Sequence, residues 1–599
     1  PLPAKLIFLV FACFFVRDDL VVYTLLLLVF YQFMHKLSLL KLAILIAILS
    51  FLSLTKGTAV IFVIIGVFTV TFSFLLRKEH SHAFISFFGF IFFTTVIWFL
   101  TGQSGSNYLN FLHTIFNYSS GYADTMLIYE SASLREVALI SLLGSYSFIF
   151  YRLKLAMKDI TYLSLIKLPI FAVLAIESLL LFVVWKHGFV RADQGHMLIF
   201  FGYILVSQTL VFFSGSYYLC LSKNQSFIWK FNYKIILLWI LITVSSLIGY
   251  NRFVQLRNMD IQLYSRAETN ILKLLDIRSE FRRLENELQA TMGSMKLPKT
   301  SALIGDQNVG YFGILPSTPI YNSFSYYPLP SFVPFSSVNE RLMNADRQYI
   351  INNTPPLEYL IADYKTIDGR LVAQDSPLAQ LEILQNYKLI DVENGNLIFK
   401  RADQTNPLTP EIKKIEKYSN GDWIDIKDEY DANKFLKFKF DKSNIERLTS
   451  FLYKTMCSYR MNVLFEDGST ESYNFMRSPS EYGFLISPFI ANNMDVINLY
   501  DKKLSPRKVS KLQIIQNKKS FMCNSDYELT TQHLRNFKVN NDNKIDGAKL
   551  RAKLFNFDVN LKSIDIVTPV VSVMSFNKNS YYLFHAPSKI NMSKDIGNY

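Results

Sequence analysis

Long apolar runs alternate with short polar breaks from the start of the chain to about Tyr250, and beyond Asn251 the residues are mixed in ordinary soluble proportions. A run of about 17–25 apolar residues matches the hydrocarbon thickness of a bilayer, and soluble proteins rarely contain several such runs in series. The pattern therefore predicts a polytopic α-helical membrane bundle of about nine spans over residues 1–250. The predicted spans are residues 4–16, 20–34, 39–55, 58–76, 83–101, 136–151, 167–185, 196–221 and 234–250. The first two are short, and they form either a re-entrant hairpin or the truncated edge of the bundle.

Past the apolar half, the periodicity changes twice. Residues 251–298 are predicted to form a membrane-proximal helix, because apolar residues recur at spacings of three and four opposite a charged face. Over residues 299–402, strand-like segments such as LEYLIADY and KLIDVENGNLIFKR alternate with helical stretches near 338–347 and 378–387. This alternation predicts a small α/β domain, closed by the linker ADQTNPLTPE.

The rest of the chain is strand-rich. Residues 411–540 contain period-two runs such as FLKFKFD and YRMNVLFEDGSTESYNFM, in which DGS is typical of a hairpin turn. They predict a β-sandwich domain. Residues 541–599 begin a further β unit with VVSVMSF and YYLFHAPSKI as strands, and this unit is cut short.

The lysines and arginines between the predicted spans favour one orientation. With the N-terminus inside, the cytoplasmic loops carry most of the basic residues, whereas the opposite loops carry fewer and dilute them with acids. The cytoplasmic set is Lys36, Lys41, Arg77, Lys78, Arg152, Lys154, Lys158, Lys167, Lys223, Lys230 and Lys234. An odd number of spans then places everything after Tyr250 outside the cytoplasm. The predicted location is the inner membrane of a bacterium, with the C-terminal domains extracytoplasmic.

Net charge, cysteines and chain ends add three expectations. The net charge of +14 comes largely from residues at helix ends, and the soluble half carries no basic stripe, so nucleic-acid binding is not expected. Cys457 and Cys523 lie in strand-like segments of an oxidising compartment and are predicted to pair. The chain opens at Pro1 without a signal-peptide n-region and stops at Tyr599 just after a strand-like stretch, so we expect a fragment of a longer protein.

The densest group of reactive side chains lies between the seventh and eighth predicted spans. The segment KHGFVRADQGH places Lys186, His187, Arg191, Asp193 and His196 within eleven residues at the outer mouth of the bundle. Histidine transfers protons near neutral pH, and arginine binds phosphate through two parallel hydrogen bonds. The structural alternative is an ordinary polar turn, but such a turn needs only one or two polar residues. This loop is therefore the leading candidate site.

A carboxylate inside the seventh span is a second candidate. Glu177 precedes Lys186 by nine residues, and burying its charge in a membrane costs several kcal/mol unless it is paired or faces water. We expect Glu177 either to hydrogen-bond a Ser or Thr within the bundle or to converge with Arg191, Asp193 and His196 on one water-accessible cavity. The second arrangement would make it a proton or cation site.

Other outer-face loops offer a few further groups. Asp18 and Asp19 either form a solvated turn or act as a base or as ligands of a divalent cation. Lys56, in the next outer loop, could hold a phosphate. The long loop at residues 102–135 is amphipathic and either lies on the membrane surface or roofs a cavity. Its chemical groups are His113, Asp124 and Glu130.

The segments KHGFVRADQGH, NYSSGYADTM, IDGR, EDGST and YGFLISPF are spread over most of residues 110–540. Together they resemble a family of large, uncharacterised bacterial polytopic membrane proteins with extracytoplasmic α/β and β domains. More loosely, the architecture resembles the lipid-linked-sugar glycosyltransferases and the O-antigen polymerases and ligases. The first resemblance implies a catalytic carboxylate at Asp18 or Asp19, and the second implies roles for Arg191 and His196.

Two functions from different classes follow. The first is a membrane-embedded enzyme of envelope glycan assembly, which transfers a sugar from a polyprenyl-phosphate carrier at the outer face. Its partners would be the lipid bilayer and a polyprenyl-phosphate-linked sugar or polysaccharide. The alternative is a non-catalytic membrane anchor or transport subunit whose extracytoplasmic β domains bind polysaccharide. No P-loop, dinucleotide fingerprint, nucleophile elbow or Cys/His metal spacing occurs in the sequence, so no further cofactor is expected.

The enzyme hypothesis assigns roles to the outer-face residues. Arg191, with Lys186 or Lys56, would hold the phosphate of the carrier. His196 or Asp193 would act as the base on the acceptor hydroxyl.

Overall fold

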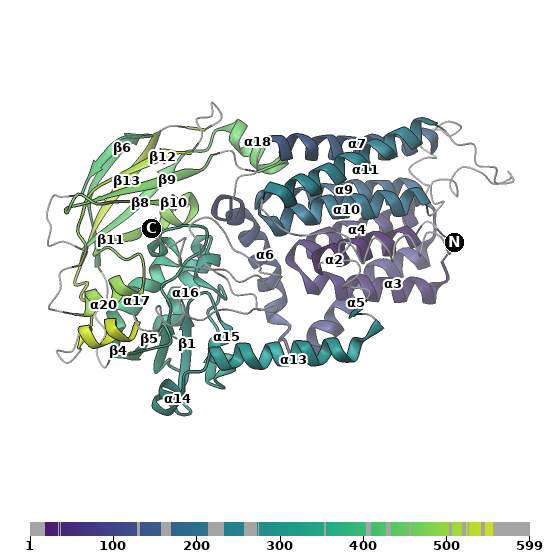
Figure 1. Cartoon of the computed structure of the whole chain (residues 1–599). Coiled ribbons are helices and arrows are strands. Elements are labelled where there is room, and N and C mark those ends of the chain that lie inside the picture. Colours follow the sequence, from purple (N-terminus) through teal and green to yellow (C-terminus); the bar gives the residue numbers. More distant parts are fainter. Residues whose placement is uncertain are drawn as a thin grey trace. The chain divides into compact units, whose positions relative to one another are not determined.

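The computed structural model of the chain describes residues 18–33, 35, 37–127, 132–156, 169–213, 233–256, 272, 273, 275–352, 355–402, 409–426, 433–454, 457–501, 506–517, 523, 524, 526–540 and 546–554. They belong to two compact units, whose elements are labelled in Figure 1. The helical unit comprises Pro1–Phe116, Met126–Ile277 and Phe451–Lys454. The strand-rich unit comprises Asn117–Thr125, Arg278–Ser450 and Thr455–Tyr599.

Eight apolar helices dominate the described part of the helical unit. Each overlaps one of the predicted spans from residues 20–34 onward, and the span predicted at 4–16 lies outside the described residues. The helices are α2 (Asp18–Gln32), α3 (Leu39–Thr55), α4 (Gly57–Leu76), α5 (His80–Leu100), α7 (Ala132–Ala156), α9 (Pro169–Val190), α10 (Gln194–Phe213) and α11 (Tyr233–Leu256).

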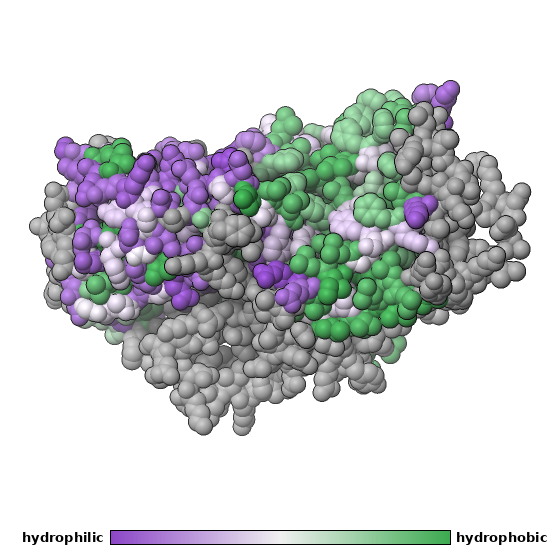
Figure 2. Space-filling view, turned by 90° about the horizontal axis from the view of Figure 1, so that it is seen from above, coloured by the Kyte–Doolittle hydropathy of each residue, from purple (hydrophilic) through white to green (hydrophobic). Residues whose placement is uncertain are grey.

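Within the described residues, four of these helices are long and apolar enough to cross a membrane, and the other four contain shorter apolar segments of 10–17 residues. The four membrane-length segments are Gly57–Leu76, His80–Leu100, Leu134–Lys154 and Pro169–Val190. Only 22% of the most apolar stretch of α5 is buried inside the unit, as expected of a helix that faces lipid. Hydrophobic residues likewise cover much of the visible surface of the helical unit in Figure 2. Several helices could therefore span a membrane, and the count of nine spans stays a prediction.

Two amphipathic helices flank the apolar ones in sequence. The loop predicted at 102–135 contains α6 (Ser106–Thr125), beside which Trp98 packs with its ring centroid 5.2 Å from that of Tyr108. The membrane-proximal helix predicted at 251–298 is described in part, as α13 (Ile277–Ser294), none of whose side chains is buried. Arg283 stabilises α13 through ion pairs with Glu280 and Glu287, three and four residues away.

Residues 308–401 build a five-stranded mixed sheet in the order β2-β1-β3-β5-β4. The first three strands are parallel to one another, and β5 is antiparallel to both β3 and β4. The strands are β1 (Asn308–Phe312), β2 (Ser325–Tyr327), β3 (Tyr359–Ala362), β4 (Tyr387–Glu393) and β5 (Asn396–Arg401). The intervening helices are α14 (Pro298–Ile304), α15 (Ser317–Tyr321), η1 (Pro334–Ser336), α16 (Glu340–Asn352), η2 (Val372–Gln374) and α17 (Pro377–Asn386).

Two four-stranded antiparallel sheets follow, in the orders β10-β9-β12-β7 and β11-β8-β13-β6. Inward-facing residues of both sheets share one apolar core, including Met461 from the first sheet and Phe438 from the second. The strands are β6 (Thr409–Ser419), β7 (Trp423–Asp425), β8 (Lys434–Phe440), β9 (Tyr459–Phe465), β10 (Thr470–Phe475), β11 (Phe484–Ser487), β12 (Val509–Gln516) and β13 (Asp526–Arg535). Three helices, α18 (Asn444–Leu452), α19 (Arg477–Tyr482) and α20 (Asn493–Tyr500), lie between strands in the sequence. The predicted DGS hairpin is confirmed, since β9 and β10 pair across it and Gly468 has a φ of 82°.

The linker predicted at ADQTNPLTPE is in part a strand. β6 begins at Thr409, and Pro410 is tolerated there because β6 is the edge strand of its sheet. A second apolar core also contains residues from both sides of the linker, such as Phe399 and Leu534. The predicted strands VVSVMSF and YYLFHAPSKI lie outside the described residues.

Cys457 and Cys523 form a disulfide with their Cα atoms 5.7 Å apart, which confirms the predicted pairing. The bond links the residue just before β9 to the segment just before β13, within the strand-rich unit.

We expect the double substitution Cys457→Ser/Cys523→Ser to lower the free energy of unfolding of the strand-rich unit by about 4 kcal/mol. The disulfide joins residues that are 66 positions apart, and opening it releases a loop of that length in the unfolded chain. Hydrogen exchange of β9 and β13 peptides across a denaturant series measures the change. Reduced wild-type protein is the matched control and should shift by the same amount. An unchanged midpoint in the double variant would contradict this account.

Candidate functional site

Charged and aromatic side chains from separate segments meet at one end of the helical unit. Asp19 lies in the first turn of α2, Lys56 lies between α3 and α4, and His187 lies in the last turn of α9. Asp193 and His196 lie at the start of α10. With Tyr23 and Arg191 they form what we call the acid–base cluster. Successive helices of a bundle run in alternate directions, which explains why these distant positions reach the same end.

One half of the cluster is built around His187. The Nδ1 atom of His187 lies 2.6 Å from the hydroxyl of Tyr23, which also contacts the hydroxyl of Thr58 at 3.1 Å. The Nε2 atom of His187 lies 3.5 Å from a carboxylate oxygen of Asp19, and Asp19 forms an ion pair with Lys56. A carboxylate thus lies between a lysine and a histidine.

The other half is built around Asp193. One carboxylate oxygen of Asp193 lies 2.5 Å from Nδ1 of His196 and accepts a hydrogen bond from the backbone N–H of His196 at 3.0 Å. The other oxygen accepts a hydrogen bond from Nε of Arg191 at 2.6 Å. Asp193 precedes α10 and therefore has the position and hydrogen bond of a helix N-cap. Asp193 therefore caps α10, as a residue of an ordinary polar turn would, and also binds His196 and Arg191.

The environment of Asp193 keeps it ionised. Burial raises the pKa of the Asp193 carboxyl, but the hydrogen bond from His196 and the charge of Arg191 outweigh burial and hold the pKa well below its usual range. A carboxylate of such low pKa is a poor proton acceptor. It can instead fix the neighbouring imidazole, whose Nδ1 we assign as protonated from this hydrogen bond, with Nε2 left as the basic nitrogen.

The two halves touch, because the ring centroids of His187 and His196 are 4.9 Å apart. About a quarter of each side chain is exposed at Asp19, Lys56, Asp193 and His196, at 24%, 26%, 24% and 24%. His187 and Arg191 are 6% and 8% exposed. A ligand that reaches the cluster would therefore meet these four residues first, and His187 and Arg191 lie deeper.

Glu177 does not join the cluster. Its carboxylate accepts hydrogen bonds from Nη1 of Arg152 at 2.7 Å and from the hydroxyl of Tyr31 at 2.6 Å, and Arg152 also contacts that hydroxyl at 2.8 Å. Glu177 precedes His187 by ten residues, or about 15 Å along α9. The bundle-internal partner is thus an arginine and not the Ser or Thr that we expected. Arg152, counted above as a loop cation, lies inside α7 and is 2% exposed, so it carries no weight in the orientation argument.

Lys186 and Asp18 are the other two predicted residues. The Nζ atom of Lys186 donates a hydrogen bond to the backbone carbonyl of Tyr453 at 2.9 Å. Asp18 is the first residue of α2, and its side chain lies outside the described ones. His187 belongs to the predicted candidate loop, whereas Tyr23 was not predicted. Tyr23 lies four residues after Asp19 and so on the same helix face, which is the one signal that could have found it.

Within the described part of the chain, no three His, Cys, Asp or Glu side chains group closely enough to hold a metal ion. The hypothesis of a divalent cation at Asp18 and Asp19 is left without a described ligand set. The one described carboxylate of the two, that of Asp19, contacts Lys56 and His187.

Charged residues also meet in the strand-rich unit. Asp124, near the end of α6, pairs with Lys442 and with Arg477, and Arg477 pairs with the buried Glu446. Arg370 donates a hydrogen bond to the carbonyl of Thr125. Two segments of the resemblance, NYSSGYADTM and IDGR, thus contact each other here. Each buried charge has a partner of opposite sign in this network, so we interpret it as structural.

Two buried acids of the same unit, Asp346 and Asp375, are likewise held by hydrogen bonds from the protein itself. Asp346 accepts hydrogen bonds from the backbone N–H of Ser331 at 2.9 Å and from the hydroxyl of Ser376 at 2.8 Å. Asp375 accepts one from the hydroxyl of Thr366. Burial raises the pKa of each carboxyl to about 6. Their partners all come from the chain itself, which is typical of acids that fix loops.

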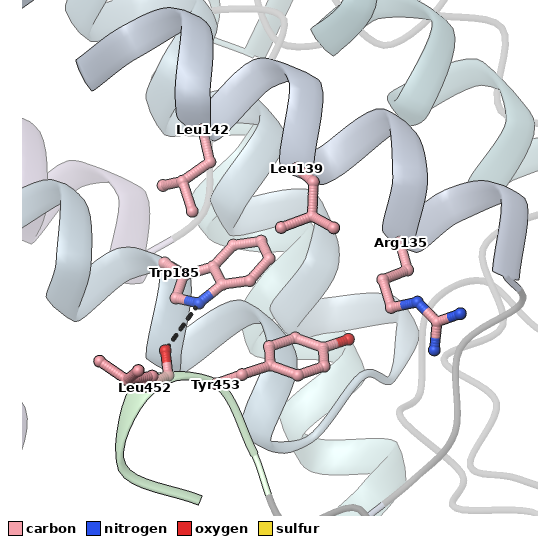
Figure 3. Close-up of a pocket in the computed structure, with 6 residues that line it drawn as sticks. All are labelled: Arg135, Leu139, Leu142, Trp185, Leu452 and Tyr453. Carbon is pink, nitrogen blue, oxygen red and sulfur yellow. Dashed lines mark hydrogen bonds between the residues drawn. The ribbon is translucent and has the colours of Figure 1, made fainter. Parts of the chain in front are cut away.

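A pocket of about 290 Å³ lies elsewhere in the helical unit (Figure 3). It is lined by Arg135, Leu139, Leu142, Trp185, Leu452 and Tyr453. The indole of Trp185 stacks on Tyr453 with ring centroids 5.1 Å apart and donates a hydrogen bond to the carbonyl of Leu452 at 3.1 Å. Trp185 and His187 are separated by about 160° around α9, so the pocket and the cluster lie on different faces of that helix.

No protein-family model, curated protein or solved structure matches the chain. The function of the acid–base cluster is therefore inferred from its geometry.

The pairing of Glu177 with Arg152 can be tested by stability. We expect Glu177→Leu to destabilise the helical unit by about 3–5 kcal/mol, because Arg152 then stays buried without its carboxylate. The double variant Glu177→Leu/Arg152→Leu removes both charges and should recover most of that loss. Thermal unfolding of the detergent-solubilised protein measures both.

The matched control is Glu79→Leu. The ion pair of Glu79 with Arg77 is more exposed, at 37% and 20%, so the loss should stay below about 1 kcal/mol. A double variant as unstable as Glu177→Leu would contradict the pairing account.

Proposed function

We propose that the chain is a membrane-embedded enzyme of envelope glycan assembly, which transfers a sugar from a polyprenyl-phosphate carrier at the outer face of the membrane. The observation that carries the proposal is the pair His196 and Asp193, in hydrogen-bond contact and in one cluster with the cations Lys56 and Arg191 at one end of an apolar helical unit. Sugar transfer needs a base for the acceptor and cations for the leaving phosphate.

In this proposal His196 is the base. Asp193 holds Nδ1 of the imidazole, and Nε2 accepts the proton of an acceptor hydroxyl as that oxygen attacks the anomeric carbon of the sugar. The bond between the anomeric carbon and the phosphate oxygen breaks, and the polyprenyl phosphate leaves with the bonding electrons. Lys56 and Arg191 stabilise the charge on the departing phosphate. Lys186, bound to the carbonyl of Tyr453, has no part in this step.

Asp19 is the second carboxylate of the proposal. It keeps Lys56 and His187 in place through the contacts described above and is itself a quarter exposed. Both loose resemblances meet here: the carboxylate of the lipid-linked-sugar glycosyltransferases would be Asp19, and the Arg and His of the O-antigen enzymes would be Arg191 and His196. These residues come from positions 19 to 196 and yet form one cluster.

The proposal includes a membrane orientation. Nine spans with the N-terminus inside would put both the cluster and the strand-rich unit on the outer face of a bacterial inner membrane. Without Arg152 the cytoplasmic loops still hold the larger share of lysine and arginine. The disulfide between Cys457 and Cys523 supports an oxidising compartment for the strand-rich unit.

We expect His196→Gln to lower the transfer rate by about 10²–10⁴-fold, since that is the usual contribution of a general base. Asp193→Asn should also lower it, through loss of the imidazole orientation. The measurement is release of polyprenyl phosphate from a labelled lipid-linked sugar by purified protein in proteoliposomes, with an acceptor glycan present. His80→Gln is the matched control, because His80 is exposed and begins α5, far from the cluster in sequence.

Transfer by His196→Gln at the wild-type rate would overturn the assignment. The non-catalytic anchor with polysaccharide-binding β domains would then be the better reading, and the N-cap role of Asp193 would account for the residues around it.

A further inference from the structure

The pocket beside α9 has one cationic end. Arg135, Leu139 and Leu142 follow one another at spacings of four and three on α7, so they form a single stripe of that helix (Figure 3). Among the described residues, Arg135 makes no ion pair or side-chain hydrogen bond. Its guanidinium lies at the edge of the pocket, next to the side that carries the Tyr453 ring. The pocket therefore offers an apolar wall and, at one end, a charge without a described counter-ion.

The position of the pocket along the helices matches a membrane interface. Arg135 lies at the start of the membrane-length segment Leu134–Lys154, and Trp185 lies near the end of Pro169–Val190. Trp and Tyr are typical of the headgroup level, where one edge of the ring is in contact with chains and the other with water. Trp185 and Tyr453 supply one residue of each type at this site.

Exposed apolar residues continue outward from the pocket along two helices. Ile140 and Leu143 of α7 are 47% and 62% exposed. The end of α18 that belongs to the helical unit is exposed as well, with Phe451 at 66% and the pocket residue Leu452 at 50%. The pocket is thus bordered by surface that favours lipid chains over water.

We propose that this pocket binds a phospholipid of the surrounding bilayer. One acyl chain packs against Leu139, Leu142 and Trp185, and the phosphate of the headgroup pairs with Arg135. Phosphate is the anion that an arginine at headgroup level meets most often in a bilayer, and it fits the guanidinium through two parallel hydrogen bonds.

The occupant is a bilayer phospholipid and not the polyprenyl carrier. Trp185 and His187 point about 160° apart around α9, so a lipid bound beside Trp185 holds its phosphate on a different face from His196 and Lys56. The site therefore does not depend on the proposed transferase function, and it stands or fails separately.

Photo-crosslinking tests the site. The full chain is reconstituted in nanodiscs with a phosphatidylglycerol that carries a diazirine in its acyl chain, and crosslinked peptides are identified by mass spectrometry. We expect labelling of the α7 peptide that contains Leu139 and of the peptide that contains Tyr453. Arg135→Ala should lower that labelling about fivefold. Leu139→Trp, which fills the pocket without a change of charge, should lower it as well, and Arg135→Lys should keep most of it.

Arg77→Ala is the matched control, since Arg77 follows the membrane-length helix α4 and pairs with Glu79. It should leave the labelling unchanged. Wild-type labelling in both Arg135→Ala and Leu139→Trp would overturn the proposal, because only general lipid contact would remain. Equal labelling by a phosphate-free diacylglycerol probe would overturn the role of Arg135. Stronger competition by polyprenyl phosphate than by unlabelled phosphatidylglycerol would overturn the choice of occupant. Gel filtration of each variant checks that it is folded.

Discussion

A charge inside a bundle of apolar helices is tolerated only beside a partner of opposite charge or beside water, and this constraint organises the helical unit. In its interior, the side chains of Glu177 and Arg152 are each 1% exposed and bind each other together with Tyr31. At one end, Asp19 binds Lys56, and Asp193 binds Arg191 and His196. The pairings of Glu177 and Asp19 join α2, α7, α9 and the loop between α3 and α4, so they help to fix which of these segments lie side by side.

The same constraint distinguishes the buried pair Glu177 and Arg152 from the acid–base cluster. Glu177 is enclosed by its partners, whereas Asp19, Lys56, Asp193 and His196 keep about a quarter of their side-chain surface open. An ion pair that is satisfied and closed needs no further role to explain it. A cluster that is satisfied but open, with an imidazole fixed at Nδ1 by a carboxylate, has the parts that proton transfer requires. This difference in exposure, and not the number of charged groups, identifies the acid–base cluster as the candidate site.

Periodicity in the sequence predicted the local elements well. Apolar runs became helices, and period-two runs became β8 and β9, because burial on one face dictates both patterns. The Cys457–Cys523 bond was predicted from compartment and strand context. Lateral packing was not predictable in the same way. Arg152 was predicted to be a loop cation, because its partner Glu177 comes 25 residues later, on another helix. The pairing of β6 with β13 joins segments more than 100 residues apart, and the sequence of neither strand indicates which strand it pairs with.

The most direct test of the acid–base cluster is to measure the equilibrium affinity of the purified chain in detergent for a polyprenyl phosphate, and to compare this affinity among variants. If Lys56 and Arg191 hold the phosphate, Lys56→Gln and Arg191→Ala should each weaken binding about tenfold or more, as loss of a charge-assisted hydrogen bond requires. Arg135→Ala, on another helix face, should bind like wild type. Unchanged affinity in Lys56→Gln and Arg191→Ala would contradict a phosphate site at the acid–base cluster.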